Sequence, residues 1–149
     1  MENSAHASLV AAYWHHYITT HVLRDDVEGD RWFWAWQHVD EAVRSADVAA
    51  LVVVVALANS CHSTSGLAFL GAGPLEDLVK AADGALFDRI INVATDHARF
   101  RRALATIWIK DRDKVQRLKT FFRLHRRFPM TPSTTPSDRS EHQPGLLSN

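Results

Sequence analysis

The sequence predicts an all-α protein, with a single helical domain over residues 1–128 and a disordered tail over residues 129–149. Two observations support this fold class. Apolar residues recur at the three- and four-residue spacing of helices through most of the first 128 residues. Four of the five prolines lie after Phe128 among many Ser and Thr residues, where too little apolar surface exists to offset the entropy of ordering.

The first two predicted helices are amphipathic. The apolar face of the first comprises Leu9, Val10, Tyr13, Trp14, Tyr17 and Ile18. The apolar stripe of the second comprises Trp32, Ala35, Trp36, Val39 and Val43, and Asp30 is its predicted N-cap. Trp34 falls on the opposite, polar face. An exposed tryptophan is typical of contact surfaces, so Trp34 is a candidate interaction residue unless another helix covers it.

The apolar run from Val48 to Ala58 has two interpretations. Its four consecutive valines, residues 52–55, suit a buried strand as well as a helix. The 11 residues exceed the length of a typical strand, and no second convincing strand exists to pair with them. We therefore favour a helix with Asp47 as its N-cap. The run is too short to cross a membrane, which takes about 20 residues.

Short helices are predicted for the rest of the domain. One ends near Leu70, and four more cover Leu75–Ala82, Leu86–Thr95, Phe100–Ile109 and Lys114–Arg127, with Gly84 as a C-terminal stop and Asp96 as an N-cap. Short helices joined by short connections pack as antiparallel pairs. From Asp47 to Trp108 the pattern is loosely HEAT-like, a two-helix solenoid without a strict period.

The most distinctive string covers residues 71–78, GAGPLEDL. Gly71 is predicted to end one helix in the left-handed conformation, with Gly73 as the next N-cap and Pro74 as the first helical residue. Glu76 then bonds back to the cap. A tight helix–helix corner accounts for the string, and the alternative is a functional carboxylate pair, Glu76 and Asp77. In the corner interpretation, one of these two carboxylates pairs with Arg89 or Arg101 on the following helices.

This string, together with Trp34-Ala35-Trp36, Asp88-Arg89-Ile90 and Arg99-Phe100-Arg101, resembles a bacterial family of helical domains of unknown function. Members of that family carry a similar GAGPLEDLL-type motif, whose final leucine is Val79 here. The resemblance covers roughly residues 10–109 and leaves out the basic helix and the tail. It implies a shared helical fold and a bacterial or phage setting, and it implies no activity.

Charge is distributed unevenly although the net charge is zero. Residues 1–109 carry a balance of −5 and residues 110–128 a balance of +6. The last helix places Val115, Leu118, Phe121, Phe122 and His125 on one face and Lys119, Arg123, Arg126 and Arg127 on the other. This basic face is either the solvated side of a docked terminal helix or a contact for nucleic acid or an acidic protein.

No pattern of residues predicts a catalytic group, a metal or a cofactor. His15, His16, His21 and His38 lack the spacing of metal ligands, and His21 is expected to be a hydrogen-bonded core histidine. Cys61 is the single cysteine, so no intrachain disulfide can form. A reducing compartment fits this composition best, and we expect a cytoplasmic protein.

The expected function is a non-enzymatic helical protein-interaction module, immunity- or regulator-like, whose partner is an unknown protein. The alternative is a nucleic-acid-binding accessory protein that uses the basic helix, residues 112–127. A homo-oligomer in which the basic face meets the acidic body of a second copy is a further expectation, and no membrane association is expected. An enzyme ranks third, and Glu76, Asp77 and Arg89 are the first residues to test for that role.

Overall fold

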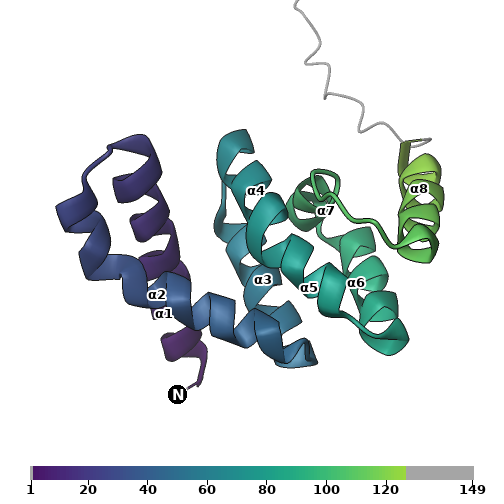
Figure 1. Ribbon diagram of the computed structural model, residues 1–149, viewed down its shortest axis with the longest axis horizontal. Helices are drawn as coiled ribbons and strands as arrows, with labels where there is room; N and C mark the ends of the chain where they lie inside the picture. The colour runs from purple at the N-terminus through teal and green to yellow at the C-terminus, as the bar shows by residue number, and fades with distance from the viewer. Residues whose placement is uncertain (1, 127–149) are drawn as a thin grey trace, which may run out of the picture.

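The computed structural model describes residues 2–126 (Figure 1). The predicted tail over 129–149, the predicted domain end at residue 128 and Arg127 lie outside the described residues. The elements are α1 (Glu2–Tyr17), the π-helical turn η1 (Ile18–Val22), α2 (Asp26–Ser45), α3 (Val48–Ser60), α4 (Thr64–Leu70), the π-helical turn η2 (Gly71–Leu75), α5 (Glu76–Ala81), α6 (Gly84–Asp96), α7 (Ala98–Leu104) and α8 (Arg112–Arg126). Residues 2–126 contain no strand, which confirms the all-α prediction for this part of the chain.

Helix α3 forms the centre of the molecule. It contacts α1, α2, α4, α6 and α7, and Val54, Leu57 and Ala58 are fully buried. A helix surrounded in this way is apolar over most of its surface, so its sequence shows little helical periodicity. The structure thereby resolves the run from Val48 to Ala58 as helix. Asp47 is its N-cap as predicted, because its side chain accepts a hydrogen bond from the Ala50 amide at 2.9 Å.

Several helix ends differ from those predicted. The N-cap of α2 is Asp25, whose side chain accepts from the Glu28 amide at 3.0 Å, and Asp30 lies inside the helix. Gly84 does not stop a helix, because Asp83 caps α6 and Gly84 is its first residue. Asp96 ends α6 rather than capping α7. For α2 and α6 an earlier aspartate supplies the cap, whereas His97, the residue before α7, makes no side-chain cap hydrogen bond.

The corner at residues 71–76 is present, but its residues have other roles than predicted. Gly71 has right-handed helical angles (φ −63°, ψ −46°), so the predicted left-handed helix end is wrong. A Cβ atom at Gly71 would overlap the Ala103 carbonyl oxygen and the Thr106 hydroxyl. Glycine is therefore needed here because α7 passes against its backbone. The chain kinks at Gly73 (φ −118°, ψ −106°), immediately before Pro74.

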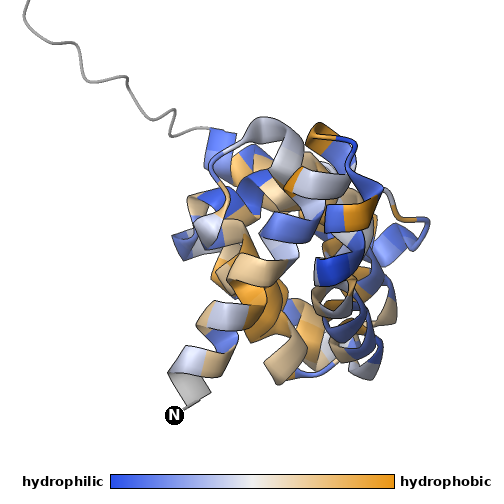
Figure 2. Cartoon of the chain, turned by 90° about the vertical axis from the view of Figure 1, so that its left-hand side faces the viewer, coloured by the Kyte–Doolittle hydropathy of each residue, from blue (hydrophilic) through white to orange (hydrophobic). Residues whose placement is uncertain are grey.

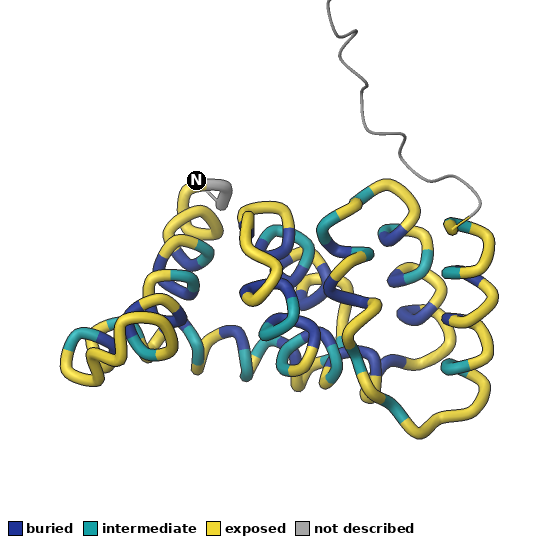
Figure 3. The backbone as a smooth tube through the Cα atoms, turned by 90° about the horizontal axis from the view of Figure 1, so that it is seen from above, coloured by how far each residue is buried: buried dark blue, intermediate teal, exposed yellow. Residues whose placement is uncertain are grey.

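The molecule is elongated, with the α1–α2 pair at one end and α8 at the other (Figure 1). Seen from above, the same two ends remain apart, and the dark blue buried residues concentrate between them (Figure 3). Helix α1 packs mainly on α2, whereas α8 packs on α6. None of the helices in the described part of the chain is long and apolar enough to cross a membrane.

Candidate protein-interaction surface

The segment between α7 and α8, residues 105–111, begins with a turn at residues 105–106 and is not helical, although a helix was predicted as far as Ile109. Helix α7 ends at Leu104 because the amide and the hydroxyl of Thr106 both donate to the Ala103 carbonyl oxygen, at 3.0 and 2.8 Å. The Trp108 amide then donates to the Glu76 carboxylate at 2.9 Å instead of continuing the helix. This arrangement leaves the Trp108 side chain 68% exposed. The predicted helix to Ile109 is therefore wrong.

Glu76 holds this segment in place. One carboxylate oxygen accepts from the Trp108 amide, and the other accepts from Lys80 Nζ at 2.5 Å. Partial burial raises the pKa of the Glu76 carboxyl, but the hydrogen bonds from Lys80 and Trp108 outweigh burial and hold this pKa below its ordinary value. Glu76 is therefore an ionised structural anchor, and it does not bond back to the cap at Gly73.

The predicted pairing of Glu76 or Asp77 with Arg89 or Arg101 is wrong. Arg101 instead donates to the carbonyl oxygens of Ala94 and Thr95, at 2.9 and 3.1 Å, and so caps the end of α6. Asp77 is exposed and lies beside a small hollow. Arg89 is exposed and forms no ion pair with the residues described. Glu76 binds the segment between α7 and α8 through the Trp108 amide, and Asp77 does not. The two carboxylates therefore do not act as a pair.

Helix α8 is attached by two basic residues that the sequence analysis did not single out. Lys114 Nζ donates to the carbonyl oxygens of Val79 and Ala82 at 2.8 Å each, at the end of α5. Arg117 pairs with Asp88 at 2.6 Å, and its guanidinium lies 4.8 Å from the centre of the Phe87 ring. A lysine opposite an uncapped helix C-terminus is a recognised arrangement, but the sequence does not show which helix end it meets.

A groove runs between residues 104–109 and α8, with a volume of about 790 Å³. We call it the α8 groove. Its apolar lining comprises Leu104, Ala105, Ile107, Trp108, Ile109, Val115, Leu118 and Phe122. Its basic lining comprises Lys119, Arg123 and Arg126. The groove therefore combines an apolar floor with three cationic side chains.

The three cationic side chains of the groove are accessible to a binding partner. Lys119, Arg123 and Arg126 are exposed and form no ion pair with the described residues. Their spacing of four and three residues places them in one row along α8. Lys110 Nζ lies 5.5 Å from the centre of the Trp108 ring, which lines the same groove. Such a surface suits a segment whose apolar side chains are flanked by carboxylates.

Trp34 lies on α2, the helix that with α1 forms the end of the molecule opposite α8 (Figure 1). Its side chain is 48% exposed, so no other helix covers it fully. The histidine prediction nearby needs correction. His21 is exposed and its ring lies against Tyr17 and Phe69, whereas His16 is the buried histidine, with Nδ1 2.9 Å from the Gly29 carbonyl oxygen.

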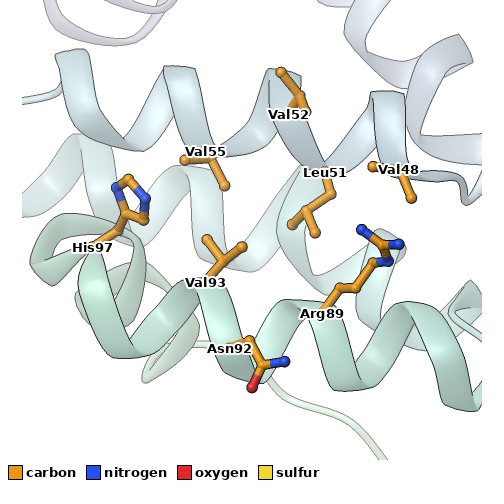
Figure 4. A pocket seen from close by; sticks show the side chains of 8 residues that line it. All are labelled: Val48, Leu51, Val52, Val55, Arg89, Asn92, Val93 and His97. Carbon is orange, nitrogen blue, oxygen red and sulfur yellow. The ribbon is translucent and has the colours of Figure 1, made fainter.

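A second hollow, of about 420 Å³, lies between α3 and α6 (Figure 4). Leu51, Val52, Val55 and Val93 form its apolar part, and Arg89 and His97 stand at its two ends. Across residues 2–126 the structure contains no group of three or more His, Cys, Asp or Glu side chains that could hold a metal ion.

The chain belongs to a family described as a family of unknown function (DUF6869), whose model matches residues 23–122. The match begins after α1 and η1 and includes most of α8, so it extends further toward the C-terminus than the resemblance noted in the sequence. No curated protein and no solved structure matches the chain.

Proposed function

We propose that the protein is a non-enzymatic protein-interaction module, immunity- or regulator-like, and that its binding surface is the α8 groove. The observation that carries this proposal is the exposed row of Lys119, Arg123 and Arg126, which forms no ion pair within residues 2–126, beside an apolar floor. A fold gains no stability from leaving Trp108 two-thirds exposed next to three unneutralised cations. A protein segment that carries both apolar side chains and carboxylates would cover the apolar floor and pair with the cations.

The attachment of α8 supports a prepared surface. Lys114 and Arg117 fix the helix on α5 and α6, while Glu76 fixes the segment that carries Trp108. Both walls of the groove are thus held before a partner arrives. A prepared surface loses less conformational entropy on binding than one that must be ordered first.

The test is capture of partners from the native host by three forms of the full chain. The wild type is compared with Arg123→Glu/Arg126→Glu and with the control Arg102→Glu/Arg112→Glu, which makes the same charge change at exposed residues outside the groove. We expect the wild type and the control to retain the same proteins and the groove variant to lose them. Equal capture by all three forms would show that the α8 groove is not the binding surface.

The alternative, nucleic-acid binding by the basic helix, is an outcome of the same experiment. Binding to phosphates releases counterions, so three contacting cations give a log–log salt slope of about −2 to −3. A 20-residue oligothymidine probe measures this directly. Salt-dependent binding to the probe with such a slope, together with capture that nuclease abolishes, would replace the protein-interaction proposal with the nucleic-acid one.

A further inference from the structure

The opposite end of the molecule carries an apolar surface that the fold does not use. Residues 18–30 comprise η1 and the first turn of α2, and we call them the α1–α2 tip. Four aliphatic side chains of the tip are exposed: Ile18 (46%), Val22 (59%), Leu23 (65%) and Val27 (78%). Such a concentration of exposed aliphatic residues on one short segment marks a contact surface. Figure 2 views this end of the molecule and shows hydrophobic and hydrophilic segments side by side.

Carboxylates surround the aliphatic side chains of the tip. The tip contains Asp25, Asp26, Glu28 and Asp30 against a single guanidinium, that of Arg24, so its formal charge is −3. Asp26 and Asp30 are exposed and form no ion pair within residues 2–126. Trp34 lies one turn after Asp30 and extends the same face of α2. The tip is thus apolar and acidic, whereas the α8 groove is apolar and basic.

The backbone holds the tip in a fixed, projecting shape. Residues 18–22 form a π-helical turn, and Arg24 adopts left-handed angles (φ 58°) although it is not a glycine. A side chain in that conformation is strained, and such strained residues cluster at functional segments. Gly29 packs so closely on Thr20 that a Cβ atom there would overlap the Thr20 hydroxyl. The two sides of the tip are therefore locked together.

We propose that the α1–α2 tip of one copy binds the α8 groove of a second copy, so that the chain assembles head to tail. This inference rests on the proposed function and names the partner. The aliphatic side chains of the tip meet the apolar floor, and Asp26 and Asp30 meet the row of Lys119, Arg123 and Arg126. Because tip and groove lie at opposite ends of the molecule (Figure 1), a copy cannot fill its own groove. The contact is heterologous, and it produces open chains or closed rings rather than a twofold dimer.

The test is the mass in solution of the full chain, measured by sedimentation at protein concentrations of about 10–300 µM. Surface ion pairs weaken as salt screens them, so association is expected at low salt and reversal to the 16.8 kDa monomer at high salt. The tip variant Asp26→Lys/Asp30→Lys and the groove variant Arg123→Glu/Arg126→Glu are each expected to weaken association at least tenfold. The control Glu41→Lys/Asp96→Lys, which makes the charge change of the tip variant at exposed residues outside both surfaces, is expected to associate as the wild type does.

Mixing the two variants separates this contact from every symmetric one. The tip variant keeps an intact groove and the groove variant keeps an intact tip, and the new lysines of the one complement the new glutamates of the other. A mixture is therefore expected to associate into alternating chains, whereas each variant alone stays largely monomeric. A chain that carries all four substitutions regains opposite charges and is expected to associate again. Circular dichroism checks that each variant is folded.

A wild type that stays monomeric at 300 µM and low salt would overturn the inference, as would a mixture of the two variants that does not associate. If the groove variant has nevertheless lost captured proteins from the host, the proposed function stands and only the identity of the partner is wrong. If capture is also unaffected, both proposals fail.

Discussion

Helices α3 and α8 are attached to the molecule in different ways. Helix α3 buries six apolar residues among five neighbouring helices, and burial of that kind has no preferred direction. Helix α8 buries only Leu118 and Phe121, and directed polar contacts from Lys114 and Arg117 complete its attachment. The difference shows how a helix can be fixed along one side while the other remains open. The α8 groove exists because α8 is attached by a few specific bonds rather than by being surrounded.

The largest expected effect lies in the densely packed part of the molecule. Gly71→Ala places a methyl group against the Ala103 carbonyl oxygen, and backbone cannot move aside cheaply. We expect the free energy of unfolding to fall by about 2 kcal/mol, as for overpacked core positions. Urea denaturation measures it. Gly84→Ala is the control, because nothing lies within 4 Å of a Cβ atom there and a small gain in stability is expected. Equal effects at both positions would show that α7 does not pack on Gly71.

A smaller effect is expected where α8 is attached. Lys114→Met keeps most of the aliphatic side chain but removes the donor to the Val79 and Ala82 carbonyl oxygens. The expected loss is about 1–2 kcal/mol, and it should appear as faster amide hydrogen exchange confined to α8 and the end of α5. Lys119→Met, on the groove side of the same helix, should change exchange by less than about 0.5 kcal/mol. Uniformly faster exchange in all helices would mean that α8 does not detach separately.

The smallest effect concerns the segment that carries Trp108. Glu76→Gln removes the charge that binds Lys80 and the Trp108 amide, and we expect a loss of about 0.5–1 kcal/mol at pH 7, since solvent reaches the pair. The pKa of Glu76 is lowered in the folded state. Its stabilisation is therefore present above the ordinary glutamate pKa and is lost as pH falls through the lower, folded pKa. Wild type and variant should converge in stability at acidic pH, and a constant difference down to pH 2 would contradict this assignment.

The sequence predicted the elements whose determinants are local. The helical spacing of apolar residues located the helices, and Asp47 was recognised as a cap because its partner, Ala50, is three residues away. The row of Lys119, Arg123 and Arg126 was also visible in the helical spacing of α8. These features depend on residues within one or two turns of each other, which is the range over which sequence patterns carry information.

Features that depend on residues far apart in the sequence could not be predicted from such local patterns. Glu76 was assigned to a local cap, but its partner is the Trp108 amide, 32 residues further along the chain. The Glu76 bond holds residues 107–109 outside the predicted helix, in a position where Ile107, Trp108 and Ile109 line the α8 groove. Glycine was likewise expected at left-handed positions, whereas Arg24 and Ala46 occupy them among the residues described. Tertiary contacts overrode local preference at each of these sites.

The hydrogen bonds of the Lys114 amine make its chemical reactivity a measure of whether α8 is attached to α5. An amine that donates to two carbonyl oxygens reacts slowly with an acylating reagent, whereas the exposed amine of Lys119, five residues further along, reacts freely. The ratio of their labelling rates therefore measures how often α8 lifts off α5. Mass spectrometry of a labelled sample reads that opening equilibrium without any substitution, in dilute solution or in the host cell.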